Sequence, residues 1–353
     1  IEHKMGILGT PTCELVFGNR EPAVGTLLGD THDGIRQMFE IITYVRMMVG
    51  LKTIAALSSG HLNARDYAMS RKQGRELVSF TGERGGRPLV EIVDHPDIRR
   101  SLLTQKAYAE GGRALVLYTA TMIDRFEAAA AQGRTDPVAV ERHRMLLPIV
   151  KTWCAESGWR VLGQESLQVF GGSGYLRDYP LEQYVRDTKI DAIYEGTTGI
   201  QSLDLFERRL LRDQGATAAL LLGEIADTAA SLAEGPLAVE ADLLAAALGA
   251  FRELLELTAA RAGHAPRVAA LGLTRLLLSM GDLVVGWLLL RTAAAAVERR
   301  NDPALLVTTD ADLDGSIAAG RWFARQVLPH LSAELSGAHL LDGEPLVLAD
   351  TSL

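Results

Sequence analysis

The sequence is poor in cysteine, in aromatic residues and in basic charge, and each shortage excludes a class of protein. Two cysteines, Cys13 and Cys154, cannot build a disulfide framework or a cysteine-based zinc site. Aromatic residues make up 6%, too few for a row of base-stacking platforms. Lysine and arginine number 36 against 44 acidic residues, a net charge of −8, which argues against a general nucleic-acid-binding protein.

Long hydrophobic runs are also missing. The longest apolar stretch, from Leu276 to Leu290, has about 15 residues and contains Asp282, whereas a membrane-spanning helix needs roughly 20. The opening residues, IEHKMGILGTPTCELVF, lack the basic segment and the following apolar segment of a signal peptide. We therefore expect a soluble cytoplasmic protein with no membrane span.

Helical periodicity dominates the 353 residues, of which 48% are apolar. The first thirty residues differ: Thr12 to Phe17 is a short run bounded by Pro11 and Gly18, and it predicts a strand. Because one or two strands cannot fold alone, this strand implies a β partner that is either missing or supplied elsewhere. We predict helices over about 32–71, 96–131, 138–169 and 199–211, and about four more between 215 and 343.

Three helices of about 30 residues, joined by short or polar breaks, favour an antiparallel bundle. The expected fold is therefore mainly α. It would have the end of a β-domain at 1–30, the bundle at 31–211 and a second helical domain at 212–353. The segment 170–198 is rich in glycine, charge and tyrosine, as functional loops on rigid scaffolds are.

Several familiar catalytic motifs fail on inspection. Gly171-Gly172-Ser173-Gly174 is not a nucleophile elbow, because Tyr175 stands where the motif needs glycine and a helix, not a strand, precedes it. Arg177 occupies the place of the last glycine in a dinucleotide-binding fingerprint. No histidine belongs to an H-E-x-x-H or Glu-x-x-His motif, so we expect no catalytic metal.

Glu195 is the strongest candidate for acid–base chemistry. It lies in IYEGTTGIQ, where Ile193 and Ile200 would partly shield its carboxylate from water. Thr198 and Gln201 have the spacing of a capping box, which would start a helix just after Glu195 and place amide dipoles near its charge. A carboxylate held in this way suits general-base work. The same residues are also compatible with a loop glutamate exposed to solvent, and from the sequence pattern alone we favour this second interpretation.

A long motif from Gln168 to Gln201, QVFGGSGYLRDYPLEQYVRDTKIDAIYEGTTGIQ, resembles the C-terminal signature of the acyl-CoA dehydrogenase family. KMGILGTPTCELVF resembles the family's last middle-domain strand, and YVRMMVGLKTIAAL, SRKQGR and VDHPDIRR follow in family order. The resemblance covers about residues 1–211. The helical remainder is similar to the C-terminal extension of the long bacterial branch, which includes 3-methylmercaptopropionyl-CoA dehydrogenase-like enzymes.

The resemblance implies an FAD-dependent oxidoreductase of fatty acid β-oxidation that converts an acyl-CoA thioester to trans-2-enoyl-CoA. Glu195 matches the family's general base, which removes the α-proton while a hydride passes from the β-carbon to flavin N5. In some members the base instead precedes the arginine that Arg46 matches, but Val45 cannot take a proton. Arg46, Tyr194 and Gly196 would contact the substrate.

The resemblance also implies a bound FAD and a second subunit. Five positions match family residues that approach the FAD, namely Arg71, Gln168, Gly171, Gly172 and Thr197. The first four would reach the FAD of a partner subunit, which implies a homodimer or homotetramer. An electron-transfer flavoprotein or a similar acceptor would take the electrons.

Two alternatives stay open at this point. An acyl-CoA oxidase uses the same base and differs in the access of oxygen. A non-catalytic helical or dimerisation module is the other, because the family's N-terminal helical domain and most of its β-domain have no counterpart in these residues. For the same reason we expect the isolated chain to be inactive on acyl-CoA.

Overall fold

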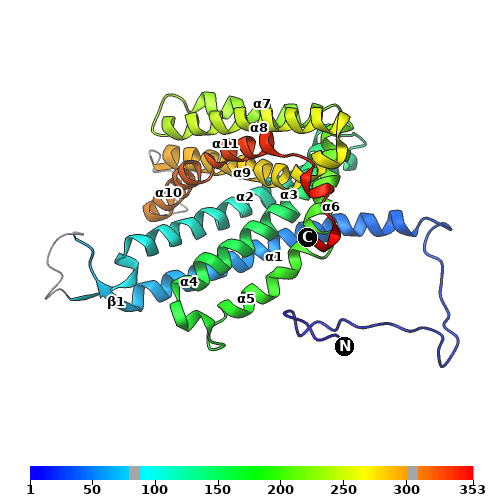
Figure 1. The fold of residues 1–353 in the computed structure, drawn as a ribbon, viewed down its shortest axis with the longest axis horizontal. Coiled ribbons are helices and arrows are strands. Elements are labelled where there is room, and N and C mark those ends of the chain that lie inside the picture. The colour runs from blue at the N-terminus through cyan, green and yellow to red at the C-terminus, as the bar shows by residue number, and fades with distance from the viewer. Residues whose placement is uncertain (79–87, 301–308, 353) are drawn as a thin grey trace.

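The computed structural model describes residues 1–78, 88–300 and 309–352, and within them the chain is mainly helical (Figure 1). The mainly α fold class is confirmed. The long helices are α1 (Gly34–Ser70), α2 (Pro96–Ala131), α3 (Pro137–Val161), α7 (Ala216–Ser231), α8 (Ala238–His264), α9 (Pro266–Arg300), α10 (Asp310–Gln326) and α11 (His330–Leu340). The shorter helices are α4 (Leu167–Val169), α5 (Leu181–Thr188) and α6 (Thr198–Leu203).

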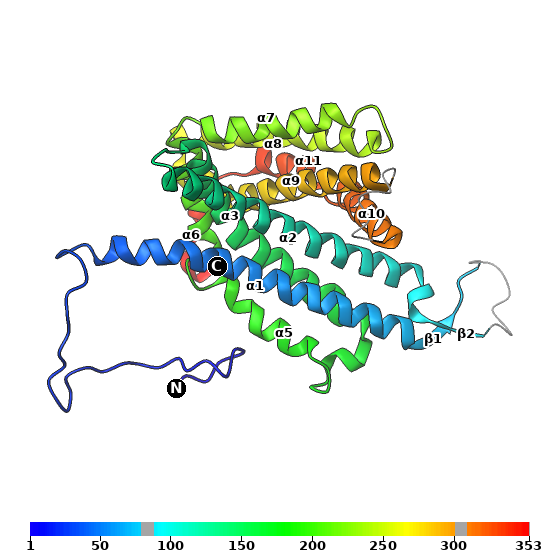
Figure 2. The same cartoon turned by 180° about the vertical axis from the view of Figure 1, so that it is seen from behind.

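The helices lie in stacked layers (Figures 1 and 2). Helices α7 and α8 form one outer layer, α9 with α10 and α11 lies beneath it, and α2 and α3 come next. Helix α1 follows, and α5 lies on its far side. Helices α1, α2 and α3 all pack against one another and alternate in direction, so the antiparallel arrangement predicted for them is present.

Local sequence explains where these helices begin. Pro96 and Pro137 occupy first-turn positions, where a missing backbone N–H costs nothing. Asp136 caps α3, because its Oδ1 accepts the backbone N–H of Ala139 at 2.9 Å. Gly133 has a φ of +67°, which turns the chain between α2 and α3.

Trp153 of α3 joins two helical groups, the first formed by α1 to α6 and the second by α7 to α11. Its indole is fully buried and stacks on Tyr108 of α2, with ring centroids 5.6 Å apart. Gly281 of α9 lets the ring approach, because a Cβ there would lie 2.2 Å from Trp153 Cδ1. One continuous core therefore runs from α1 through α2 and α3 into α9.

The strand predicted for Thr12 to Phe17 is wrong. Residues 1–33 follow an extended path beside the helices without strand pairing in the described structure (Figure 2). An extended segment becomes a strand only when a neighbour accepts and donates along its backbone. This segment is instead fixed near its start, where Asp187 Oδ1 accepts the Ile7 amide at 2.6 Å and Arg186 donates to the Met5 carbonyl at 3.0 Å.

Three other expectations need correction. The break after α1 contains an antiparallel pair, β1 (Lys72–Arg75) and β2 (Leu89–Glu91), followed by a 3-10 turn over Ile92–Asp94. The segment 170–198 contains α5, bracketed by 3-10 turns η3 (Gly171–Tyr175) and η4 (Lys189–Ala192). Beyond residue 215 the described residues form five helices rather than about four, with 3-10 turns over Glu344–Leu346 and Asp350–Ser352 near the end.

Two helices, α1 and α9, are long and apolar enough to cross a membrane by length and composition. The sequence had led us to expect none. In α9, 56% of the apolar window is buried inside the protein, against α2, α3, α8 and α10, which accounts for its composition. In α1 the buried share is 33%. Its exposed apolar side chains include Ile35, Ile41 and Met48.

Candidate active site

The loop between η4 and α6 holds Glu195 in an unusual conformation. Glu195 is half-buried and has a φ of +57°, and Gly196 follows with a φ of +96°. A positive φ is disfavoured for a residue that has a Cβ, so the surroundings must hold Glu195 in place. At Gly196 an added Cβ would lie 2.5 Å from Gln201 Nε2, so only glycine fits.

Side chains from three helices hold the carbonyls of these two residues. Arg46 Nε of α1 donates to the Glu195 carbonyl at 3.2 Å, and Gln201 Nε2 of α6 donates to the same oxygen at 3.1 Å. Lys151 Nζ of α3 donates to the Gly196 carbonyl at 2.7 Å. The loop is therefore fixed through its backbone oxygens.

Tyr194 is held by a buried carboxylate. Its hydroxyl donates to Asp191 Oδ1 at 2.8 Å, and Asp191 also accepts from Lys52 Nζ at 2.8 Å and Thr53 Oγ1 at 2.7 Å. The Asp191 side chain is 0% exposed. Burial and the neighbouring Asp191 carboxylate raise the pKa of Tyr194, so the phenol stays protonated and keeps donating.

The capping box predicted for Thr198 and Gln201 does not form. Thr197 is the N-cap of α6, and Thr198 Oγ1 instead donates to Glu156 Oε1 at 2.5 Å. Gln201 donates back to the Glu195 carbonyl, as described above. The helix does begin directly after the loop, as expected, but tertiary partners rather than a reciprocal cap fix its start.

The predicted site residues form two groups, one beside Arg46 within α1 and one just beyond the C-terminal end of that helix. Arg46 lies beside Tyr194, Glu195, Gly196 and Thr197. The second group is Arg71, Gln168, Gly171 and Gly172. These lie where Tyr67, one turn before Arg71, stacks on Phe170 at 4.3 Å and hydrogen-bonds to Ser173. Arg46 and Arg71 are separated by about 37 Å of helix at 1.5 Å per residue.

Each of the two groups of site residues has open space beside it that a ligand could occupy. Arg71, Gln168, Gly171 and Gly172 are exposed, and a Cβ built at either glycine would meet nothing within 4 Å. Beside Arg46, a cavity of about 930 Å³ lies between α1, the end of α2, the start of α3 and α6. Apolar side chains of Phe39, Phe126 and Leu147 line it, with charged side chains such as Arg144 and Arg208 among them.

Comparison with known proteins identifies the family of this chain. A family model for the acyl-CoA dehydrogenase C-terminal domain matches residues 32–210, and one described as acetyl-CoA dehydrogenase C-terminal like matches 221–343. The broad-specificity linear acyl-CoA dehydrogenase FadE5 of Mycobacterium tuberculosis is 44% identical over 100% of this chain and 58% of its own length. The chain belongs to the acyl-CoA dehydrogenase family.

Other relatives agree with this assignment. The 3-methylmercaptopropionyl-CoA dehydrogenase of Ruegeria pomeroyi is 36% identical over 95% of this chain and 55% of its own length. The chain thus spans little more than half the length of these two relatives. Among solved structures, an acyl-CoA dehydrogenase from Bacillus anthracis complexed with FAD shares the fold, with a TM-score of 0.68 at 17% identity, over 89% of this chain and 51% of that one.

Sequence reasoning missed the residues that hold the acyl-CoA dehydrogenase motif in shape. Lys151, Asp191, Lys52 and Thr53 were not selected, although each contacts the loop or its anchor. One signal was available: Lys151 interrupts the apolar run LLPIVKTWCA in α3. A buried lysine needs a partner, and the carbonyl of Gly196 is that partner.

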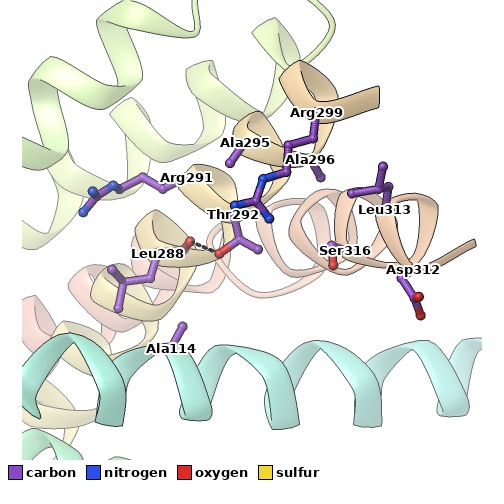
Figure 3. Close-up of a pocket in the computed structure, with 10 residues that line it drawn as sticks. All are labelled: Ala114, Leu288, Arg291, Thr292, Ala295, Ala296, Arg299, Asp312, Leu313 and Ser316. Atoms are coloured by element: carbon purple, nitrogen blue, oxygen red, sulfur yellow. Dashed lines mark hydrogen bonds between the residues drawn. The ribbon is translucent and has the colours of Figure 1, made fainter. Parts of the chain in front are cut away.

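A further pocket of this acyl-CoA dehydrogenase chain lies away from the motif. It has a volume of about 510 Å³ between α2, α9 and α10 and is lined by Ala114, Thr292 and Ser316 among others (Figure 3). The hydroxyl of Thr292 is engaged with the Leu288 carbonyl of its own helix at 3.0 Å. This pocket contains none of the predicted site residues.

Proposed function

We propose that this chain carries the general base of an FAD-dependent acyl-CoA dehydrogenase and that Glu195 is that base. The observation that carries the proposal is the loop itself: a half-buried glutamate at positive φ, with its carbonyl and that of Gly196 held by Arg46, Gln201 and Lys151. Polar side chains from three helices therefore fix the backbone that carries the Glu195 carboxylate. Such pre-organisation is what proton transfer in a defined geometry requires.

The chemistry of the residues follows from this arrangement. The Glu195 carboxylate would take the α-proton of an acyl-CoA thioester. When bound, FAD would supply the acceptor for the hydride that leaves the β-carbon, so that two electrons and one proton pass to the flavin side. The α,β bond becomes double, and the product is a trans-2-enoyl-CoA.

The backbone amide of Glu195 can assist this proton transfer. Within the described residues it donates to no carbonyl or side-chain acceptor, although the loop around it is well bonded. An amide left available beside the base can donate to the thioester oxygen, where negative charge develops as the α-proton leaves. We assign that role to it, with Arg46, Tyr194 and Gly196 forming the wall of the thioester site.

The residues predicted to hold FAD suit a dinucleotide. Thr197 makes no side-chain capping bond and is exposed, so its hydroxyl can donate to a ligand. Arg71 is an exposed guanidinium, the group that matches a diphosphate best. Gly171 and Gly172 leave the backbone open to close approach. We propose that Thr197 serves the FAD of its own subunit and the distant Arg71 group serves that of a partner.

Glu195→Gln tests the base in the full-length, FAD-bound protein that contains this chain, since the isolated chain is expected to be inactive. With a linear acyl-CoA, the substrate class in the name of FadE5, we expect the rate constant of flavin reduction to fall by about 10²–10⁴ or more, because glutamine cannot accept the proton. Stopped-flow absorbance of the flavin measures this, and equilibrium titration of acyl-CoA should give an affinity within a few-fold of the original.

Glu141→Gln is the matched control, since Glu141 is an exposed carboxylate paired only with Arg144. Its flavin reduction should be unchanged. Normal flavin bleaching by the Glu195→Gln protein would exclude Glu195 as the base and with it the proposed function.

A further inference from the structure

Lys151 is a charged side chain in the middle of a buried helix. It lies in α3 between Val150 and Thr152, and all three residues are fully buried. Its ammonium group reaches the carbonyl of Gly196 at 2.7 Å, one residue beyond Glu195. Removing a charged group from water costs free energy, which a hydrogen bond to the buried charge must offset. The bond to the Gly196 carbonyl is such a bond.

The contact falls on the Gly196–Thr197 peptide, the second peptide after the Glu195 Cα. Glu195 and Gly196 both have positive φ, and the carbonyls of both are hydrogen-bonded by side chains. Arg46 and Gln201 share the Glu195 carbonyl, whereas among the described residues Lys151 alone donates to that of Gly196. Loss of Lys151 would therefore free one of the two peptides that keep the loop in its disfavoured conformation.

The groups around Lys151 decide its charge. Burial lowers the pKa of Lys151 to about 8. Asp191 of η4, Glu156 of its own helix and Glu195 of the loop favour the charged form, and Arg46 of α1 opposes it. Lys52 of α1 faces Asp191 and neutralises part of that carboxylate. Lys151 is thus a cation at neutral pH and loses its charge as the pH rises through about 8.

We propose that Lys151 is a positioning residue: its ammonium group fixes the Gly196 peptide, so that the carboxylate and amide of Glu195 are held in the geometry of proton transfer. It does not touch the reacting atoms. This inference rests on the proposed function and adds to it a residue outside the loop motif that sets the efficiency of the base.

The Lys151→Met variant removes the charge and the hydrogen bond at nearly constant volume. In the FAD-bound protein we expect flavin reduction by a linear acyl-CoA to slow by about 10–100-fold at pH 7, because misplacement of a reacting group by about 1 Å can have that effect. We expect acyl-CoA affinity to change by less than about three-fold. In the unsubstituted protein the rate constant should fall as the pH rises through about 8, and Lys151→Met should lack that decline.

Lys189→Met is the matched control. Lys189 lies in η4, approaches the same Glu156 at 3.9 Å and covers the Trp159 ring, but makes no contact with either carbonyl. It should keep both the rate and the decline near pH 8. A second readout needs no turnover: amide hydrogen exchange in the peptide spanning 193–200 should be faster in Lys151→Met and unchanged in Lys189→Met.

The outcomes separate the two proposals. If Glu195→Gln is inactive but folded Lys151→Met reduces flavin at the original rate with the original pH profile and loop exchange, the positioning role is wrong and the base assignment stands. If Glu195→Gln stays active, the base assignment fails whatever Lys151→Met does. If Lys151→Met does not fold, the unsubstituted protein decides: a rate constant independent of pH between 7 and about 9 would overturn the inference.

Discussion

Asp191 anchors the residues that precede Glu195. It is completely buried, and its two oxygens accept three hydrogen bonds, from Lys52, Thr53 and Tyr194. Lys52 and Thr53 lie on α1, whereas Tyr194 lies in the loop, so the carboxylate ties the loop to the first long helix. Its charge is compensated by Lys52, which makes burial tolerable.

Asp191→Ala should therefore be strongly destabilising. It leaves two hydroxyls and the partly exposed Lys52 without their acceptor, and we expect a loss of about 1–3 kcal/mol in the free energy of unfolding, the range for leaving a buried donor unsatisfied. Urea unfolding followed by circular dichroism measures it. Asp97→Ala removes an exposed partner of Arg100 and should cost at most about 1 kcal/mol. Equal losses in the two variants would contradict the anchoring role.

For individual residues, the sequence could indicate those of the motif but not the distant side chains that hold the motif in place. Glu195, Tyr194 and Gly196 are contiguous, and Arg46 could be assigned only through the family resemblance. Asp191 and Lys151 act through contacts 138 and 45 residues away in the chain, which no local pattern encodes. The failed capping box has the same origin, because Glu156, distant in sequence, takes the hydroxyl of Thr198.

Among the elements, α1 and α3 cross at a close approach that supports the site. Gly50 of α1 lies against Val150, where an added Cβ would be 2.7 Å from the Val150 carbonyl oxygen. Val150 directly precedes Lys151 and Gly50 lies one turn beyond Arg46, so the crossing sets the spacing of two side chains that hold the loop. Backbone cannot move aside as a flexible side chain can, so the packing at Gly50 is rigid.

Gly50→Ala tests that packing against helix propensity. Alanine favours a helix over glycine by about 0.5–1 kcal/mol, but here the clash should dominate and leave a net loss of about 1–3 kcal/mol. Gly223→Ala in α7 meets nothing within 4 Å and should instead gain up to about 1 kcal/mol. Thermal unfolding of both variants gives the comparison, and a gain at Gly50 would show that the helices can separate.

The elements themselves were predicted unevenly. Helix α2 begins and ends where the proline and the apolar periodicity place it, and α1 ends within a residue of the predicted position. Helix α5 was missed because LEQYVRDT is short and polar, with Leu181 as its one fully buried apolar side chain. The strand at Thr12 was wrong because β pairing depends on a partner, which a local pattern does not specify.

For the whole molecule, the contact between the two helical groups carries a buried charge. Trp153 of α3 donates its indole N–H to Asp282 of α9 at 2.8 Å, and Asp282 lines a cavity of about 870 Å³ between α2, α3, α9, α10 and α11. Burial raises the pKa of Asp282 to about 6, although the Trp153 hydrogen bond and Arg160 oppose the shift. The sequence showed Asp282 as an interruption of an apolar run but could not show that α3 supplies its partner.

The raised pKa of Asp282 makes the stability of the fold depend on pH. Unfolded, Asp282 loses its proton near its ordinary pKa of 3.8; folded, it keeps the proton to about pH 6. The folded state therefore binds more protons between about pH 4 and 6, and its stability falls as the pH rises through that window. Two pKa units correspond to about 3 kcal/mol, an upper value for the penalty that remains above pH 6.

Asp282→Asn should remove this penalty, because an amide oxygen still accepts the Trp153 N–H and carries no charge. We expect the variant to match the unsubstituted protein near pH 4 and to exceed its stability by up to about 3 kcal/mol at pH 8. Urea unfolding at both pH values measures the difference, with the exposed Asp242→Asn of α8 as control. A difference between Asp282→Asn and the unsubstituted protein that does not change from pH 4 to pH 8 would mean that Asp282 titrates normally, and that water reaches the contact between the two helical groups.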